Sequence, residues 1–468
     1  MRKLTGFFFL FFSVVTLAQE SLFTLLDNSE TGIDFSNDLV DTKQHSIFLY
    51  ANYYGGAGVG IGDFDNDGLD DIFFAANLID DKIYKNLGNF EFEDKTEKSG
   101  IINNGSWSTG VTVADVNNDG LLDIYVSCEL YDDAPILRKN KLYINKGNFK
   151  FEESAEKWGV DVDRRTRHSV FFDYNNDGLL DLYLLNHPPN TGNFSPFFGT
   201  DMTLPEYNLQ LFENKGDHFI DVTVAAGLDR AGFPNAAVIG DFNKDGWADI
   251  YVANDFDAPD FLYFNNQDGS FSYKTESSLR HTSFYSMGVD AADINNDSHL
   301  DLMVLDMTAE DNFRLKSNMS GMNPDSFWNV VKGGGHYQYM FNTMQLNNGN
   351  NTFSDVAQLT GTAATDWSWS SLVADFDNDG NKDIYITNGL LRDIRNTDAD
   401  KKISDIVSKK INEYIINNPD DTDISLWDVV DLQELLDIMP SQKLKNYYYK
   451  NDGNLEFSNI TENSGLNQ

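Results

Sequence analysis

Short acidic segments, each nine residues long, recur six times along the chain. They begin at residues 63, 115, 173, 241, 293 and 375, and the first one reads DFDNDGLDD. Positions 1, 3, 5 and 9 of every copy carry Asp or Asn, whose side-chain oxygens are ligands for hard cations. Carboxylates at this density repel one another unless something positive lies between them. The pattern therefore predicts a cation site in each segment.

The other positions of the segment indicate that the cation is calcium. Position 6 is Gly in five copies, which suits a tight turn with positive φ. Position 7 has no shared side-chain chemistry, so a common ligand there must be the backbone carbonyl. Carboxylate and carbonyl oxygens around a flexible turn favour Ca²⁺ over Mg²⁺, and up to six ions are expected. The expected calcium-ligating side chains are Asp63, Asp65, Asp67, Asp71, Asp115, Asn117, Asp119, Asp123, Asp173, Asn175, Asp177, Asp181, Asp241, Asn243, Asp245, Asp249, Asp293, Asn295, Asp297, Asp301, Asp375, Asp377, Asp379 and Asp383.

The fifth copy departs from this pattern because Ser298 replaces the turn glycine. A serine there must adopt a left-handed conformation, which costs roughly 1 to 2 kcal/mol. We therefore expect the fifth calcium site to be the weakest.

The flanks of the segments exclude an EF-hand and indicate β-strands. An EF-hand needs a Glu at position 12 and helices on both sides, whereas position 12 is apolar in all six copies. Position 2 is also always apolar, and a short apolar run such as IFFAA or IYVSC follows each copy. Apolar runs of this length are typical of buried strands. Calcium would therefore bridge the two strands, A and B, of a β-hairpin.

A second repeated element follows each hairpin and reads as strand, glycine turn, strand, for example KIYKNLGNFEFEDKTEKSGI. Each unit thus has four antiparallel strands, A to D, and units of this kind repeated six or seven times form a β-propeller. The fold class is therefore all-β, of the seven-bladed type, with six recognisable calcium-loop blades and one incomplete blade. Two amphipathic helices are expected within an insertion at about 395–446.

The acidic loops, of the form D-x-[DN]-x-D-G-x-x-D, resemble the FG-GAP or VCBS-type repeat of the integrin α-subunit propeller and its bacterial relatives. The resemblance covers nearly the whole chain after the N-terminus. The stretches GGHYQYMFNTMQLNNG and TDWSWSSLVADFDNDGNKDIYITNGLLRD are similar to a secreted bacterial subgroup in which an ASPIC/UnbV-type domain often follows. No such domain is recognisable in this sequence. The resemblance implies a calcium-binding adhesion module, and further domains of a longer parent protein are a possible partner.

A D-type strand is also expected before the first unit, in SLFTLLDNSETGIDF. This makes seven D strands but six A-B-C sets. The ring could be seven-bladed with its last blade incomplete, or six-bladed with a spare strand, and the chain could be a fragment of a longer protein. An open sheet edge invites pairing with another chain.

The N-terminus indicates where the protein is located, and its net charge argues against one class of partner. Residues 1–18 have two basic residues, an apolar run and a small-residue end, which is typical of a signal peptide, and the propeller is expected to occupy residues 19–468. The apolar run is short for a membrane span, and no lipobox cysteine follows it. The expected location is secreted, periplasmic or at the cell surface. The formal net charge of −40 argues against a nucleic-acid partner.

The arginines indicate a ligand-binding face. In an up-and-down blade the A-B and C-D turns lie on one face and the B-C and D-A connections on the other. All arginines after residue 18 fall in B-C or D-A connections, opposite the calcium loops. Guanidinium groups suit carboxylate or sulfate recognition, although they could equally pair with local aspartates. The candidate ligand-binding residues are Arg164, Arg165, Arg167 and Arg280.

No established catalytic motif is present, so we expect a binder of a glycan or of an extracellular protein rather than an enzyme. Aromatic residues of the same connections could stack on sugar rings or pack between blades. Two alternatives remain open. One is a polyuronate lyase that uses an Arg/His/Tyr set on this face, and the other is a purely structural spacer of a longer surface protein. The lyase residues would be Arg167, His168, Arg280, His281 and Tyr285.

Overall fold

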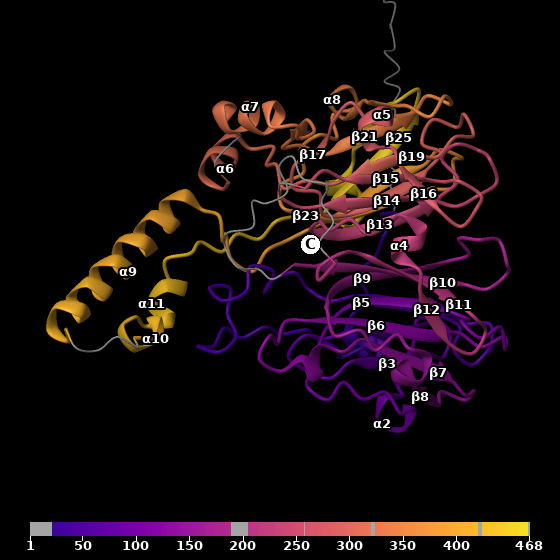
Figure 1. The fold of residues 1–468 in the computed structure, drawn as a ribbon, viewed down its shortest axis with the longest axis horizontal. Helices are drawn as coiled ribbons and strands as arrows, with labels where there is room; N and C mark the ends of the chain where they lie inside the picture. The colour runs from indigo at the N-terminus through magenta and orange to yellow at the C-terminus, as the bar shows by residue number, and fades with distance from the viewer. Residues whose placement is uncertain (1–20, 189–204, 257, 320–322, 420–423, 467–468) are drawn as a thin grey trace, which may run out of the picture.

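Six four-stranded antiparallel sheets follow one another along the chain in the computed structural model (Figure 1). The structure describes residues 21–188, 205–256, 258–319, 323–419 and 424–466. The predicted signal peptide, residues 1–18, lies outside the described residues. Each sheet is one blade with strands in the order A, B, C, D. The predicted all-β propeller of four-stranded blades is therefore confirmed.

The blades follow the acidic segments closely. Blades 1 to 3 consist of β1 (Val59–Gly62), β2 (Asp71–Phe74), β3 (Lys82–Asn86) and β4 (Phe92–Asp94); β5 (Trp107–Ala114), β6 (Asp123–Glu129), β7 (Lys141–Asn145) and β8 (Phe151–Glu153); and β9 (Arg165–Phe172), β10 (Asp181–His187), β11 (Gln210–Asn214) and β12 (Phe219–Asp221). Blades 4 to 6 consist of β13 (Pro234–Gly240), β14 (Asp249–Asn254), β15 (Phe261–Asn265) and β16 (Phe271–Tyr273); β18 (Val289–Ala292), β19 (Asp301–Val304), β21 (Thr343–Asn347) and β22 (Phe353–Asp355); and β23 (Ser368–Ala374), β24 (Asp383–Asn388), β25 (Tyr447–Gly453) and β26 (Glu456–Asn459).

The acidic segments form the A-B turns. In blade 1, Gly62 pairs with Asp71, so the loop between them, residues 63–70, closes the hairpin. The inner strands β1, β5, β9, β13, β18 and β23 line a central cavity of about 390 Å³. The A-B turns therefore lie at one end of the ring, and the connections that join blades lie at the other.

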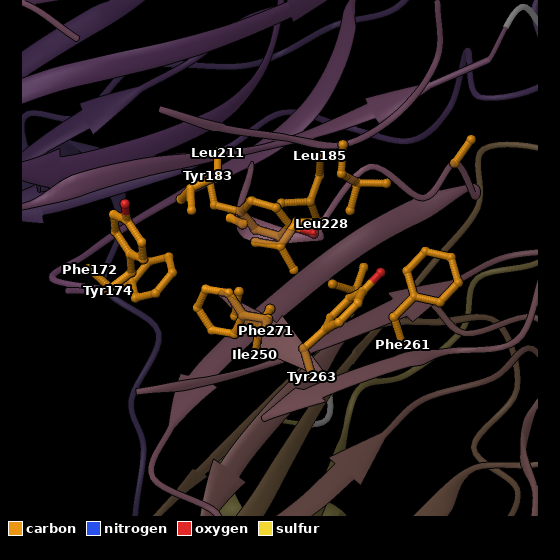
Figure 2. Close-up of a cluster of buried hydrophobic side chains, with 14 of the residues drawn as sticks. Phe172, Tyr174, Tyr183, Leu185, Leu211, Leu228, Ile250, Phe261, Tyr263 and Phe271 are labelled. Atoms are coloured by element: carbon orange, nitrogen blue, oxygen red, sulfur yellow. The ribbon is translucent and has the colours of Figure 1, made fainter. Parts of the chain in front are cut away.

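Apolar side chains from neighbouring blades fill the space between the sheets (Figure 2). Between blades 3 and 4, Tyr183 and Leu211 pack with Ile250 and Tyr263, and all four are fully buried. Strands of this kind carry apolar residues on both faces because the sheet of an internal blade is covered by a blade on either side. Stability is thus shared among the interfaces between blades.

In blades 2 to 6 an asparagine near the end of the C strand joins the blade to the preceding blade. Asn145 in blade 2 donates from Nδ2 to the carbonyl of Phe64, which is position 2 of the acidic loop in blade 1. The same bond recurs four more times. The other donor and acceptor pairs are Asn214 with Val116, Asn265 with Tyr174, Asn347 with Phe242 and Asn451 with Ile294.

One-turn helices follow the D strands and were not expected from the sequence. They are α2 (Thr96–Ser99), α3 (Ala155–Trp158), α4 (Thr223–Ala226), α5 (Thr275–Ser278), α8 (Ala357–Thr360) and α12 (Thr461–Ser464). A glycine with positive φ ends five of them, such as Gly159 at 76°. This glycine lets the chain turn toward the A strand of the next blade.

Insertions between strands B and C carry most of the remaining helices: α6 (Asn312–Ser317), α7 (Pro324–Lys332), α9 (Thr397–Asn417), α10 (Leu426–Val429) and α11 (Leu432–Leu436). A short 3₁₀-helix (Pro135–Arg138) and a parallel pair, β17 (Thr282–Ser283) with β20 (Gln338–Tyr339), also lie in the connections. Figure 1 shows α9, α10 and α11 standing off from the sheets.

The prediction of a single second helix in the insertion is wrong. The first helix is confirmed as α9, whereas the second is split into α10 and α11. Val430 is extended, and the Asp431 side chain accepts the Glu434 N–H as a new N-cap. An aspartate that can cap a new helix competes with continuing the old one.

The N-terminal segment is the other difference from expectation. Residues 21–27 form no assigned strand, and α1 (Asn28–Thr31) begins after the capping residue Asp27. The segment still lies beside blade 6, because Phe23 N–H donates to Ser464 O at 2.8 Å.

We predict that Asp260 makes the protein less stable as the pH rises. This fully buried carboxylate accepts hydrogen bonds from Tyr251, Asn254 and Ser286, and burial raises its pKa to about 7. A folded-state pKa above the unfolded value means that the folded state holds the proton more tightly. Its contribution is therefore present at low pH and is lost between about pH 4 and pH 7, at up to about 1.4 kcal/mol per pH unit.

The variant Asp260→Asn should flatten that slope, as measured by denaturant unfolding at pH 5 and pH 8. Blade 2 has Asn140 in the corresponding place, where its Oδ1 accepts the Cys128 N–H, so an amide fits the position. Asn140→Ala, which removes a neutral partner, is the matched control and should lower stability equally at both pH values. An unchanged slope in Asp260→Asn would contradict the prediction.

Candidate functional site

The acidic loops, numbered 1 to 6 with their blades, are folded around their own carboxylates. In loop 1, Asp63 accepts the N–H groups of Asp67 and Gly68 at 3.0 and 2.8 Å. Asp67 in turn accepts the N–H of Leu69 at 3.0 Å. The same bonds recur in all six loops, so the carboxylates at positions 1 and 5 are held in place by the backbone.

The aspartate at position 9 has a structural role that the spacing alone did not reveal. Asp71 is fully buried, and its two oxygens accept the N–H groups of Phe64, in its own loop, and of Asn86, in strand C. The corresponding residue makes both bonds in every other blade. Burial raises the pKa of this carboxyl to about 6 in loops 1 and 5 and to about 7 in loops 2, 3 and 4.

The oxygens of loops 1 and 6 converge as a cation site requires. Ligand atoms of Asp63, Asp65 and Asp71 lie within 4.8 Å of one another, and those of the equivalent residues in loop 6 do the same. The Oδ1 atom of Asp65 is buried and has no hydrogen-bond partner. A buried carboxylate oxygen without a donor is costly, and a calcium ion would relieve that cost. The residues present therefore fit the predicted calcium ion.

A lysine lies on the carboxylates of these same two loops. Lys85, from β3, contacts Asp65 and lies 2.7 Å from Asp67, and Lys450, from β25, makes the equivalent contacts in loop 6. In both loops position 3 is Asp, whereas in loops 2 to 5 it is Asn and no lysine occupies the strand position. The ammonium group thus offsets the extra carboxylate, and it shows that the loop accommodates a positive charge.

The fifth loop has the conformation that its sequence suggested. Ser298 lies at φ 71°, in the left-handed region, whereas the glycines at position 6 of the other loops lie between 84° and 93°. Its expected weaker calcium affinity stays a prediction.

Among the described residues, two further cavities lie at the opposite end of the ring. The first, of about 40 Å³, is lined by Tyr285, Trp367, Trp369 and Arg395 around the buried carboxyl of Asp255. The second, of about 390 Å³, is lined by side chains that include His45, Tyr131 and Arg165. Trp369 lines both the smaller cavity and the central one.

Three of the four candidate arginines are held by protein partners. Arg164 donates to Asn208, Arg165 contacts Asp132, and Arg167 pairs with Glu129 at 3.0 Å. Arg165 and Arg167 belong to the start of strand β9, so their predicted place in a D-A connection is wrong. Arg280 is exposed.

The residues of the lyase alternative do not all meet in one cavity. Arg167 and His168 line the central cavity, and Tyr285 lines the small aromatic one. Arg280 and His281 line neither, and His281 Nε2 lies 3.1 Å from Asp355 Oδ2. Burial, followed by the charge of Arg167, lowers the pKa of His168 to about 4.

Comparison with known protein families agrees with this geometry. Residues 63–126, 241–304 and 324–386 match the family of FG-GAP-like repeats. The first two matches each begin at position 1 of an acidic loop and end in strand B of the next blade, and the third ends in β24. The resemblance drawn from the loops is therefore confirmed.

Several solved structures are similar to this chain. They include a lectin of Agrocybe aegerita that recognises non-reducing terminal N-acetylglucosamine (16% identity, 86% of this chain and 78% of that chain, TM-score 0.43). They also include the biofilm matrix protein Bap1 of V. cholerae (14%, 61% and 36%, TM-score 0.32) and a GH32 β-fructofuranosidase of Bombyx mori (8%, 70% and 68%, TM-score 0.32). No curated protein matches the sequence.

We predict that Lys85→Met tightens calcium binding at loop 1. Removing the ammonium group leaves one more uncompensated carboxylate beside the ion, and one unit charge at about 4 Å from a divalent ion changes the binding free energy by about 2 kcal/mol even in water, which is roughly thirtyfold in affinity. The metal-free protein should become less stable, because the carboxylates then repel one another. Titration calorimetry on chelator-treated protein measures the affinity.

Lys82→Met is the matched control. Lys82 belongs to the same strand but pairs with Asp94, away from the loop, so its removal should leave calcium binding unchanged. Equal calcium affinities for Lys85→Met and Lys82→Met would contradict the assignment of loop 1 as a calcium site.

Proposed function

We propose that this chain, an FG-GAP repeat β-propeller, is a secreted calcium-binding module that binds a glycan or an extracellular protein through the face opposite its acidic loops. The observation that carries the proposal is the separation of the two chemistries. Carboxylates gather in the A-B turns, whereas arginines, aromatic side chains and cavities gather among the connections between blades.

Calcium would be held by the Asp and Asn oxygens at positions 1, 3, 5 and 9, together with the position 7 carbonyl. When bound it supplies positive charge that offsets the repulsion among these carboxylates. The position 9 aspartate joins the loop to strand C. Each ion would thereby make the A-B hairpin more rigid and leave the ligand face in a defined shape.

The opposite face suits ligand recognition because its connections are long and varied. The helical insertions lie in these connections, and the arginines at the start of β9 and the aromatic cavity around Trp369 lie at the same end of the ring. Binding residues commonly lie on loops that a rigid scaffold positions. The guanidinium groups would suit a carboxylate or sulfate of the ligand.

Secretion rests on the N-terminal pattern of residues 1–18, with the propeller as the remainder of the chain. Among the described residues, none of the helices is long and apolar enough to cross a membrane. A role in adhesion at the cell surface, similar to that of the integrin α-subunit propeller, follows from the same proposal.

The lyase alternative keeps one supporting observation. His168 lies beside Arg167 in the central cavity and is neutral at neutral pH, but its lowered pKa makes it a weak base. The spacer alternative requires neither binding nor turnover. Oligouronides therefore separate the three: saturable binding without cleavage supports the module, cleavage supports the lyase, and neither supports the spacer.

We predict that Trp369→Ala and Arg280→Ala each weaken binding of oligouronides at least about tenfold, which corresponds to about 1.4 kcal/mol. These two residues test the face better than Arg165 or Arg167, whose carboxylate partners would be left unpaired. Binding is measured by calorimetry in the presence of calcium.

Arg230→Ala is the control, because the Arg230 guanidinium lies 4.0 Å from the centre of the Tyr273 ring and is not a candidate ligand contact. All three variants should keep the calcium-dependent rise in Tm of the parent protein. Unchanged affinity in both Trp369→Ala and Arg280→Ala would rule out this face for such ligands.

A further inference from the structure

Two kinds of contact recur between neighbouring blades, and the second is made where position 2 is aromatic. One is the bond from the C-strand asparagine to the position 2 carbonyl of the preceding blade. The other joins the position 2 ring to the first phenylalanine of the next D strand. Its ring centroids lie 5.9 Å apart in Phe64–Phe151 and 6.3 Å apart in both Tyr174–Phe271 and Phe242–Phe353.

On the side of blade 1 that faces away from blade 2, these contacts have no partner among the described residues. Among the described residues, Asn86 donates from Nδ2 to Asp70 O alone, within its own blade. Phe90 is 69% exposed, whereas the equivalent Phe149 of blade 2 is 6% exposed beneath Lys85 of blade 1. The groups of blade 1 that correspond to the contacts of Asn145 and Phe149 with a preceding blade therefore lack such a neighbour.

The exposure of side chains in β1, the inner strand of blade 1, supports the same conclusion. Val59 and Ile61 are 53% and 62% exposed, while Val111, the equivalent of Val59 in blade 2, is 8% exposed against β1. Gly60, on the other face of β1, lies close to Val111 and Val113 of blade 2. Only the face of β1 that points away from blade 2 lacks apolar cover.

Blade 6 carries the complementary half. The position 2 carbonyl of its loop belongs to Phe376, and within the described part of the chain no asparagine donates to it. Leu372 occupies the position in β23 that faces the next blade elsewhere in the ring, and it is 50% exposed. Blades 6 and 1 thus end in surfaces that are complementary, yet among the described residues Asn86 does not donate to Phe376 O.

Phe23 stands where the D strand of one further blade would be. Its ring lies 5.9 Å from that of Phe376, as Phe151 does from Phe64. A Cβ built on Gly465 would meet Phe23 O at 2.0 Å, and one on Gly100 would meet Phe151 O at 2.3 Å. The N-terminal segment therefore fills the outer place of a seventh blade.

We propose that a three-stranded antiparallel unit of the same repeat, with its own acidic loop, docks between β23 and β1 and completes a seventh blade with the segment around Phe23. The occupant is polypeptide joined after α12. Each earlier D-strand helix leads through its end directly to the A strand of the next blade, and α12 ends beside this position in the same way.

The exposed contacts specify this occupant rather than a second copy of the chain. The site needs a C-strand asparagine for Phe376 O, a position 2 carbonyl for Asn86 and a loop against Phe90. A unit with strands A, B and C offers all three. In a second copy, all six such units are already paired within four-stranded blades.

The test is to place a second copy of residues 229–266, which contain strands A, B and C of blade 4, directly after Leu466. The control extension has the same length and consists of Gly and Ser. The blade-derived extension should raise Tm by at least about 4 °C over the control, because it buries Val59, Ile61 and Leu372.

Asparagine substitutions give a second readout, which compares the losses of Tm that two variants cause in the same chain. In the unextended chain, Asn86→Ala should lower Tm clearly less than Asn145→Ala, since only Asn145 bonds to a neighbouring blade. In the extended chain the two losses should become equal.

Three results would overturn the proposal. One is no gain in Tm over the Gly/Ser extension, and another is equal losses for the two asparagine variants in the unextended chain. The third is a dimer of the unextended chain, seen by sedimentation, that the blade-derived extension does not dissociate, because the site would then belong to a second copy.

Discussion

A buried aspartate at the end of each acidic loop is the interaction on which the rest of the molecule depends. Asp71 and its five counterparts accept N–H groups from the loop and from strand C, so one carboxylate at the start of strand B joins the acidic loop to strand C. Its neighbours at positions 1 and 5 fold the loop by the same kind of bond. The result is a turn in which several carboxylates face one another, and that arrangement requires a compensating cation. Lysine meets part of this requirement in loops 1 and 6, and calcium would meet it in all six.

The blades depend on one another in series rather than on a single core. Each blade offers a position 2 carbonyl and apolar side chain on one side and a C-strand asparagine on the other, so an internal blade is satisfied only by two neighbours. This explains why exposed apolar residues gather at Val59, Ile61 and Leu372, on the faces that end the series. The same arrangement leaves the connections between blades free to vary, and the cavities and arginines lie among them.

The blade architecture could be predicted from the sequence because its signals are local. Apolar residues flank every acidic loop, and α9 has a clear amphipathic pattern. The one-turn helices were missed because four residues show no periodicity, although a glycine such as Gly159 after each of five of them was an available signal. Lys85 was missed because its contact with Asp65 spans twenty residues and depends on the hairpin being formed. The hydrogen-bonding role of the position 9 aspartate was also not predicted, because its partners are backbone N–H groups, which a pattern of side-chain types does not show.

Calcium in the acidic loops is the central claim, and it connects the loop geometry with the proposed binding module. The most direct measurement is the calcium content of the purified protein, by mass spectrometry of the metal after dialysis against a calcium buffer and removal of free ion. About six ions per chain are expected, with the loss of one ion in a variant that carries Asp63→Ala and Asp65→Ala together. A protein that retains no calcium, or whose calcium content is unchanged by that double substitution, would contradict the account.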